Sequence, residues 1–458
     1  MPDSRCFGRD SCRRATAAFP WARPGWPGRK WSIEYVSCDA GAGRGIAGRR
    51  ECHRGPGRRA QGNFPGPGGG CGRGRLRDPP RGPCPGKTGY RGSAAHSGSV
   101  RRDGLPGRRG GALKPDYVKP LDRRHGRVEL SQGAGGRAMM QLIGEVFARA
   151  LGNEYLNQGD DGARLPAPGG RIVIATDAHV VSPLFFPGGD IGCLAVHGTL
   201  NDVAVMGATP LYLAASFILE EGFPLADLIR IVDSMATAAR EAGVPVVTGD
   251  TKVVEAGKAD GVFITTTGVG SLREDVDLSG AHARPGDGVL LSGPIGDHGM
   301  AIMSLREGLA FDAPIVSDTA ALHGLVKTLL DAVPTIRCLR DPTRGGLAST
   351  LNEISRQSGV GMVIEEAAIP VRPAVAAACE LLGLDPLNVA CEGRLVVICP
   401  PEQEAAALAA LSAHPLGREA ALVGRVQADP ACFVQMRTRF GGRRHVDWLS
   451  GEQLPRIC

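Results

Sequence analysis

Val247-Thr-Gly-Asp-Thr-Lys-Val-Val254 places a glycine, an aspartate and a lysine between two pairs of valines. The apolar residues at its start predict a strand over Val244–Thr248, with Gly249-Asp250-Thr251-Lys252 following at the strand's end. An aspartate beside a glycine is usually part of a turn or a helix cap. Alone, this motif therefore indicates a strand and a turn.

Three further acidic motifs in the same region give the first one more weight. They are Gly159-Asp160-Asp161, Thr176-Asp177 and Asn201-Asp202, each beside an apolar segment. We expect all four at strand ends or in loops, so that they meet at one edge of a sheet. Clustered carboxylates repel one another unless a cation neutralises them, and Mg²⁺ is the natural cation where phosphate is present. The four motifs together predict a magnesium–phosphate site.

Two Gly-rich stretches predict contacts to an anion. Gln132-Gly-Ala-Gly-Gly136 opens a helical run over Ala138–Leu151, and free N–H groups at a helix start can bind phosphate. Asp341-Pro-Thr343-Arg344-Gly-Gly346 leads into another helix, where Arg344 adds a charged donor. A helix cap without ligand is the alternative for the second stretch.

Three other features divide between chemistry and packing. Glu392, in Cys391-Glu392-Gly393, precedes a strand-like run where a buried carboxylate would be unusual, so it is a candidate base. A solvated turn is the alternative. His298 of Gly296-Asp-His-Gly299 is expected to be structural. Phe185-Phe186, in a loop of glycine and proline, is expected at an interface or in the core.

The apolar patterning predicts two α/β domains over residues 116–275 and 285–445, followed by a flexible tail, 446–458. The first domain is expected to hold a mixed sheet covered by helices, among them the amphipathic segment Leu225–Ala242. The polar, Gly-rich stretch Ser271–Gly288 separates the two. No internal repeat stands out.

Residues 1–115 differ from the rest in composition. Residues 1–110 contain 21 Arg and 2 Lys against 5 Asp and 2 Glu, while the whole chain has a net charge of +6. The rest of the chain is therefore acidic, and its charge makes a nucleic-acid partner unlikely in our interpretation. We expect 1–115 to be disordered for lack of periodic apolar residues, or to be a spurious extension. An Arg-Gly arm that binds RNA is the alternative.

Nothing in the sequence predicts export or membrane insertion. No apolar run reaches the roughly 20 residues of a membrane helix, and no signal-type apolar region follows the N-terminus. The 13 cysteines form no regular disulfide framework, which favours a reducing cytosol. We therefore expect a cytoplasmic protein.

The chain ends in Pro455-Arg456-Ile457-Cys458. The proline discourages a terminal helix or strand, so we expect the end to point outward. A thiol on the last residue is unhindered and can be carried into the active site of another protein. We interpret Cys458 as a carrier nucleophile that reacts as its thiolate. A frayed end without function is the alternative.

Residues from about 128 to 458 resemble the HypE family of hydrogenase maturation proteins, part of the PurM-like superfamily that includes aminoimidazole ribonucleotide synthetase. The aspartate motifs alone indicate the superfamily, whereas Gly-Asp-Thr-Lys-Val-Val and the terminal Pro-Arg-Ile-Cys are specific to the family. The matching segments are Phe185–Gly192, Gly198–Asp202, Phe217–Gly222, Val247–Val254, Gly296–Gly299, Asp341–Gly346 and Pro455–Cys458. The resemblance implies a two-domain PurM-like α/β fold that dimerises through its first domain. For that homodimer we expect Phe185-Phe186 and Leu211–Leu219 to supply the apolar surface.

The resemblance also implies a reaction and its partners. HypE proteins receive a carbamoyl group from HypF on their C-terminal cysteine, dehydrate it with ATP to a thiocyanate, and pass cyanide to the iron on the HypC–HypD complex. Carried to this sequence, the catalytic residues are Cys458, Lys252, which holds phosphoryl oxygens or developing charge, and Glu392, which removes an N–H proton. Mg²⁺ is assigned to Asp161, Asp202 and Asp250. The implied nucleotide contacts are Gly133, Gly135, Gly136, Asp177, Asn201, Gly249, Thr251 and Arg344.

Two positions depart from the family's usual sequence. The first Gly-rich loop begins Gln132-Gly-Ala rather than His-Gly-Ser, and Cys391 stands where an asparagine is usual. Thiamine-monophosphate kinase and selenophosphate synthetase share the aspartate motifs and are the rival enzymes, but neither explains the terminal cysteine. A non-catalytic scaffold with an RNA-binding arm is the rival from another class, and it should not turn over ATP.

Overall fold

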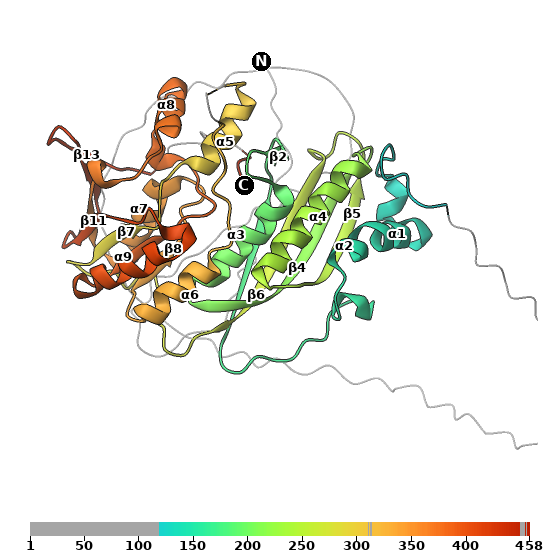
Figure 1. Ribbon diagram of the computed structural model, residues 1–458, viewed down its shortest axis with the longest axis horizontal. Coiled ribbons are helices and arrows are strands. Elements are labelled where there is room, and N and C mark those ends of the chain that lie inside the picture. The colour runs from blue at the N-terminus through green and yellow to red at the C-terminus, as the bar shows by residue number, and fades with distance from the viewer. Residues whose placement is uncertain (1–118, 310, 312–313, 449–453, 455) are drawn as a thin grey trace, which may run out of the picture. The chain divides into compact units, whose positions relative to one another are not determined.

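The protein is represented by a computed structural model that describes residues 119–309, 311, 314–448, 454 and 456–458. The expectations for residues 1–115 lie outside these residues. The described part holds two larger sheets with helices packed on them, and a small two-stranded sheet of β2 (Phe185–Phe186) and β3 (Gly189–Asp190) (Figure 1). No helix in this part of the chain is long and apolar enough to cross a bilayer.

The first sheet has four strands in the order β1-β6-β4-β5. Its strands are β1 (Ile172–His179), β4 (Ala208–Glu220), β5 (Val246–Val254) and β6 (Val262–Leu272). β4 and β5 run parallel, and the other neighbours are antiparallel. β1 and β5 are therefore the two edges of this sheet.

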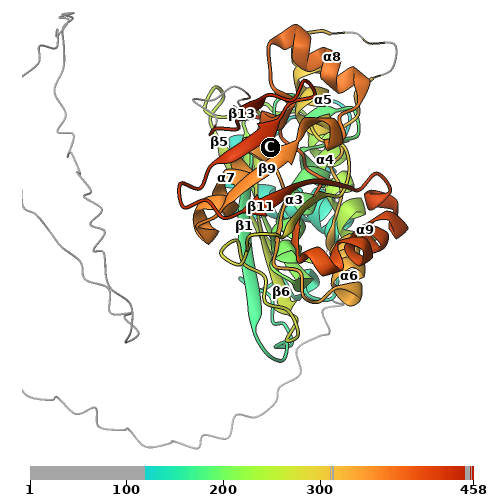
Figure 2. The same cartoon turned by 90° about the vertical axis from the view of Figure 1, so that its left-hand side faces the viewer.

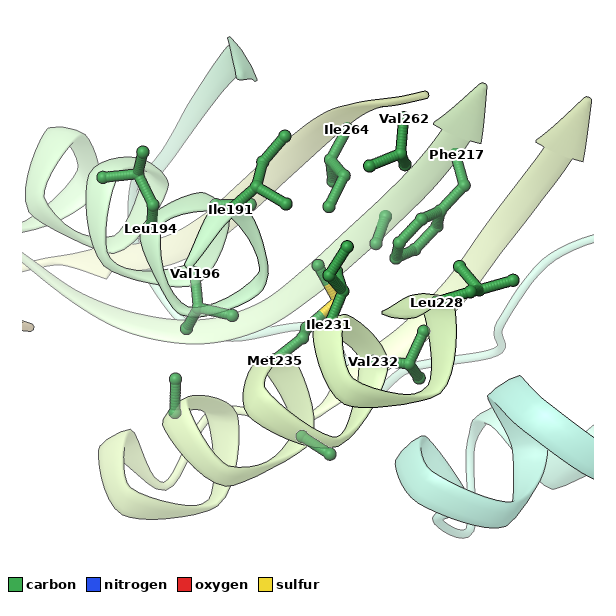
Figure 3. Close-up of a cluster of buried hydrophobic side chains, with 14 of the residues drawn as sticks. Ile191, Leu194, Val196, Phe217, Leu228, Ile231, Val232, Met235, Val262 and Ile264 are labelled. Carbon is green, nitrogen blue, oxygen red and sulfur yellow. The ribbon is translucent and has the colours of Figure 1, made fainter. Parts of the chain in front are cut away.

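Two long helices cover one face of the first sheet. They are α3 (Ile191–Val205) and α4 (Leu225–Ala242), which pack on each other and lie across β4 and β6 in Figure 1. Figure 3 shows the core between helices and sheet, where Phe217 of β4 meets Ile231 and Val232 of α4. Burial of one such side chain stabilises the fold by about 1.5–3 kcal/mol. We call this covered face the inner face and the opposite one the outer face.

The second sheet has seven strands in the order β13-β12-β9-β11-β7-β10-β8. Only β9 and β12 pair in parallel. Its strands are β7 (Gly288–Leu291), β8 (Cys338–Arg340), β9 (Gly361–Glu365), β10 (Val396–Cys399), β11 (Ala421–Gln427), β12 (Val434–Arg437) and β13 (Arg443–His445).

Five helices accompany the second sheet. They are α5 (Asp297–Arg306), α6 (His323–Ala332), α7 (Gly346–Ser358), α8 (Pro373–Leu382) and α9 (Glu404–Ala413). Figure 2 shows α6 and α9 side by side, away from α8. Buried residues of α6, α9 and β10 share one core cluster with the end of α3, so the two sheets are joined by packing.

The segment before the first sheet is helical. It consists of α1 (Gly136–Leu142), a π-helical stretch (Ile143–Ala148) and α2 (Arg149–Leu151). The helix predicted over Ala138–Leu151 is thus present, with wider turns in its middle.

The acidic motifs do not all stand where the sequence predicts them. Thr176-Asp177 lies inside β1, Asn201-Asp202 inside α3, and Gly249–Lys252 inside β5. β5 continues through its glycine because every residue from Thr248 to Val254 is paired with β4. Gly249 fits there because a Cβ at this position would lie 2.3 Å from the carbonyl oxygen of Ala215. The expectation of strand ends and loops is therefore wrong for these three motifs.

Candidate active site

The first sheet separates the predicted site residues onto its two faces. Along β1, burial alternates, and Asp177 and His179 point to the inner face. His179 Nε2 lies 3.3 Å from the Thr266 hydroxyl, which donates to the carbonyl of Ala195 in α3. On β5, Asp250 pairs with Ser216, the neighbour of the buried Phe217, so Asp250 points to the outer face.

Carboxylates gather beside α3 on the inner side. A Cβ on Gly198 of α3 would lie 3.5 Å from Asp177 Oδ2 and 3.9 Å from Glu392 Oε2. Asp202, one turn further along the same helix, interacts electrostatically with Asp177 and with Asp341. We call Asp177, Asp202, Asp341 and Glu392 the inner carboxylate cluster. Gly198 leaves open the space that these side chains face.

The cluster carries more negative charge than its surroundings compensate. Burial, and then the carboxylates of Asp341 and Asp177, raise the pKa of Asp202 to about 7. Burial raises the pKa of Asp341 to about 6. Burial, and then Asp341 and the other carboxylates, raise the pKa of Glu392 well above its usual range. Arg344, exposed at the rim, opposes the shift at Asp202.

Glu392 is held rigidly although its carboxyl has a free oxygen. Its backbone N–H donates to Asp318 Oδ1 at 3.1 Å, and its backbone carbonyl accepts from Asn201 Nδ2 at 3.2 Å. Arg394 approaches the other oxygen of Asp318 at 3.5 Å. Glu392 Oε1 is buried without a hydrogen-bond partner. An unpaired buried carboxyl oxygen is costly, which favours a role in binding or catalysis.

The Asn201 side chain helps to hold the backbone around Glu392 in place. Its Nδ2 donates to the carbonyls of Ala320 and Glu392, and its Oδ1 accepts from the Leu322 N–H. Both amide hydrogens are therefore occupied within the chain. In this structure Asn201 fixes the Glu392 loop, and its assignment as a nucleotide contact stays a prediction.

The C-terminus points inward, against the sequence expectation. The carbonyls of Cys458 and Arg456 accept from the backbone N–H groups of Val180 and Ser182 at 3.0 and 3.1 Å. The Ile457 side chain is 4% exposed and belongs to the main core cluster. Figure 1 marks the C-terminus beside β2 and α5. The end docks because its backbone continues the pairing at the sheet's edge and because Ile457 is apolar.

Docking brings the terminal thiol to the inner carboxylate cluster. The Cys458 thiol lies close enough to Glu392, Asp177 and Arg344 to interact with them electrostatically. Burial, and then Glu392, raise the pKa of the thiol. Docked in this way, Cys458 is protonated at neutral pH.

Lys252 is not part of this arrangement within one chain. Its Nζ lies 2.9 Å from Asp250 Oδ2 on the outer face, where both side chains are more than half exposed. The hydrogen bond from Lys252 lowers the pKa of Asp250. Three strand spacings, about 14 Å, separate β5 from β1. The expectation that all four motifs converge is therefore wrong.

The remaining predicted residues lie on the β5 side or in loops. Gly133 packs against Val253 of β5, and Thr251 is buried on the inner face. Gly135 and Gly136 adopt positive φ at the start of α1, with open space where a side chain would be. Asp161 is exposed in the loop before β1. Within the described residues, no three acidic, histidine or cysteine side chains are grouped as ligands of one metal ion, so Asp161, Asp202 and Asp250 do not form a common site in a single chain.

Two residues of the site were not predicted. His179 is buried beside Asp177, and burial lowers its pKa, so the ring is neutral. The spacing Asp177-Ala-His179 inside a strand could have shown that both side chains share a face. Asp341 was seen only as a neighbour of Arg344, because a lone aspartate before proline resembles a turn.

The cluster fits a divalent cation in its charge and chemistry. Oxygen ligands suit Mg²⁺, and a cation there would favour the charged form of Asp202 and Asp341, whose pKa values are raised by burial and then by neighbouring carboxylates. Arg344 at the rim suits a phosphate.

Comparisons with known proteins agree with this geometry. Residues 159–272 match the N-terminal domain, and residues 284–437 the C-terminal domain, of AIR synthase related proteins. The carbamoyl dehydratase HypE of Azotobacter vinelandii is 70% identical over 338 residues, which are 74% of this chain and 99% of that protein.

Solved structures extend the likeness to three dimensions. A crystal structure of hydrogenase maturation protein HypE in complex with ATP covers 72% of this chain and 99% of its own, with 50% identity and a TM-score of 0.70. A crystal structure of a HypE–HypF complex covers 67% of this chain and 99% of its own, with 51% identity and a TM-score of 0.60. The two-domain PurM-like α/β fold is confirmed, and the rival enzymes and the scaffold are set aside.

Proposed function

The chain belongs to the HypE family of carbamoyl dehydratases, and on that premise we propose that Cys458 carries the carbamoyl group that this enzyme dehydrates to a thiocyanate with ATP. The proposal rests on one observation, the docking of the Cys458 thiol against Glu392. A group bound to that sulfur would extend into the inner carboxylate cluster.

The reaction defines what the site must do. A thiocarbamate, R–S–C(=O)–NH₂, becomes R–S–C≡N when its oxygen leaves as phosphate and its nitrogen gives up two protons. Phosphorylation is needed because an amide oxygen is a poor leaving group. Glu392, whose Oε1 is unpaired, accepts an N–H proton as the triple bond forms. Its raised pKa makes it a better base once it is ionised.

ATP and Mg²⁺ have distinct places in this proposal. Asp202, together with the phosphate oxygens of ATP, would hold Mg²⁺, which would supply neutralisation of phosphate charge. Arg344 would bind phosphate oxygens. Gly133, Gly135, Gly136, Gly249 and Thr251 stay as proposed nucleotide contacts on the β5 side. Asp161 and Asp250 stay as proposed metal ligands only if a second chain brings them to the site.

A homodimer would complete the site. The outer face exposes Ile172, Ile174 and Ile218, by 51%, 63% and 38%, together with the Asp250–Lys252 pair. We propose that a second copy covers this face and that Lys252 acts in the partner's site. Phe186 cannot supply dimer surface because it is buried against His298. The half-buried Phe185, which stacks with Arg230, stays a proposed part of it. Along Leu211–Leu219, only the alternate residues reach the outer face.

The terminus must also leave the site. A protonated, half-buried thiol is a weak nucleophile, so loading by the HypF partner requires an undocked end. We propose that residues 446–458 act as a flexible tail and that cyanide then passes to the HypC–HypD iron complex. We place these steps in the cytoplasm. We also keep the division into domains at residues 275–285, between the two family matches.

Intact-protein mass tests the proposal. The full chain, incubated with HypF, carbamoyl phosphate and ATP, should gain one carbamoyl group and then lose one water. The loss of water should not occur when a non-hydrolysable ATP analogue replaces ATP after loading. Turnover of ATP without any change in mass would contradict the proposal.

A further inference from the structure

The docked terminus is held by a histidine that the reaction above does not use. In the extended end, the carbonyls of Arg456 and Cys458 pair with the strand-edge segment at Ser182 and Val180. The carbonyl of Ile457 points the other way, and His298 Nε2 lies 2.8 Å from it.

The hydrogen-bond directions at His298 follow from its partners. A carbonyl oxygen only accepts, so Nε2 carries the hydrogen and donates to Ile457. Nδ1 must then accept, and the Ser317 hydroxyl at 2.8 Å is its donor. The Ser317 oxygen in turn accepts from the Thr319 N–H at 3.1 Å. Ser317 therefore fixes the tautomer that can bind the terminus.

The ring has no freedom to move. His298 is fully buried, and it packs edge-to-face on Phe186 with ring centroids 5.5 Å apart. Burial lowers its pKa to about 4, so the ring is neutral, as this arrangement requires. At the other end of α5, Arg306 donates to the carbonyls of Arg456 and Ser182.

We propose that His298, oriented by Ser317, is a positioning residue that holds the Ile457 carbonyl and thereby keeps Cys458 against Glu392. The proposal deepens the proposed function and rests on it for the importance of that position. The contacts at the carbonyls of Arg456 and Ile457 hold the backbone that carries the Cys458 sulfur. A displacement of about 1 Å at a reacting group can cost on the order of 100-fold in rate.

Thiol reactivity tests the docking independently of catalysis. The full chain is treated with iodoacetamide, and alkylation of each cysteine is followed by peptide mass spectrometry. His298→Phe keeps a ring against Phe186 but has no donor, and it should raise the Cys458 rate about tenfold. His298→Gln, which restores an N–H donor, should lie closer to wild type. His125→Phe, at a side chain that is 84% exposed, is the control and should change nothing.

Two other cysteines report on the fold in the same samples. Cys432 is half-buried and gives a reference rate, while the buried Cys338 should stay protected. If His298→Phe exposes Cys338, the proposal is tested with Ser317→Ala instead. This variant should raise the alkylation rate of Cys458 several-fold. An unchanged Cys458 rate in a variant with protected Cys338 overturns the proposal.

The chemical readout separates this proposal from the proposed function. With carbamoylated protein, His298→Phe should bind ATP as wild type does but dehydrate about 10–100-fold more slowly, and His298→Gln should recover part of the rate. Equal dehydration by His298→Phe and wild type would also overturn the role of His298. If wild type never dehydrates its carbamoyl group, the proposed function fails, while alkylation still decides how the terminus is held.

Discussion

Asp177 and Asp250 lie in adjacent cross-strand rows of one four-stranded sheet, yet they project from opposite faces of it. Asp177 pairs with Thr266, whose hydroxyl contacts α3 on the inner face, whereas Asp250 pairs with Ser216 on the outer face. Lys252 shares the face of Asp250 and forms an ion pair with it. A site that needs both Glu392 and Lys252 therefore requires two chains.

Mixing two inactive variants tests this requirement. Glu392→Gln should lose about 100-fold or more in dehydration rate because the base is removed, and Lys252→Ala should lose a similar factor. If Lys252 acts across the dimer, an equal mixture of both variants, allowed to exchange subunits, should recover about a quarter of wild-type activity. Half of the dimers are then mixed, and each has one complete site. The measurement is the rate of water loss by intact-protein mass.

The controls for this mixture are simple. Each variant mixed with itself should stay inactive, and both should bind ATP. A mixture with no recovered activity, despite proven subunit exchange, would place Lys252 in the site of its own chain and contradict the dimer proposal.

The exposed isoleucines of the outer face provide a second test. Ile174→Glu would place a charge within the proposed interface, and the cost of burying it should weaken dimerisation by at least 100-fold. Sedimentation velocity at micromolar concentration should give a monomer for this variant and a dimer for wild type. Leu381→Glu, at a side chain of α8 that is 70% exposed, is the matched control and should remain dimeric. Wild type that sediments as a monomer would disprove the dimer.

The inner carboxylate cluster predicts a specific dependence of stability on pH. The folded-state pKa of Asp202 is raised to about 7, so the folded state binds more protons than the unfolded state between about pH 4 and 7. The free energy of unfolding should therefore fall as pH rises through this range. Asp202→Asn removes this contribution and should gain about 4 kcal/mol relative to wild type at pH 8 compared with pH 4.

Urea unfolding at several pH values measures this difference. Asp275→Asn is a control of opposite sign, because the hydrogen bond from Arg273 lowers the pKa of Asp275. Mg²⁺ with ATP should reduce the fall in unfolding free energy with rising pH for wild type, and should have less effect on Asp202→Asn. If the free energies of unfolding of wild type and Asp202→Asn changed in parallel with pH, the pKa of Asp202 would not be raised in the folded protein.

Local patterns predicted the parts of the fold that depend on local physics. The helix expected over Leu225–Ala242 is present with the same limits, because its apolar stripe faces the sheet and Gly243 ends it with a positive φ. Of the two alternatives for Glu392, the buried carboxylate is confirmed, since the residue is 2% exposed. Signals of this kind are contained within a single segment.

Features that depend on residues far away in the sequence could not be predicted from local patterns. Gly249-Asp250 resembles a turn, but pairing with β4 keeps it in a strand and so sets which face Asp250 and Lys252 occupy. Pro455 suggested a terminus that points outward, yet Ile457 has a binding place in a core built by residues far away in the sequence. Both corrections come from tertiary contacts that override local propensity.

The terminal thiol gives the last prediction. Cys458→Ala removes one sulfur and keeps the backbone contacts to Val180 and His298, so the melting temperature should change little. Carbamoyl loading should nevertheless be lost completely. The other cysteines described by the structure cannot replace it. Cys338, Cys379, Cys391 and Cys399 are buried, Cys193 lies inside α3, and Cys432 lies in the connection between β11 and β12.

Removal of Ile457 together with Cys458 separates docking from chemistry. This variant should also fail to load, but it should melt at a lower temperature because it loses a buried side chain worth about 1.5–3 kcal/mol. Differential scanning calorimetry and intact-protein mass after incubation with HypF measure the two effects. A carbamoyl adduct on Cys458→Ala would show that another residue carries the group. A melting temperature unchanged by loss of Ile457 would show that the inward terminus contributes nothing to the folded state.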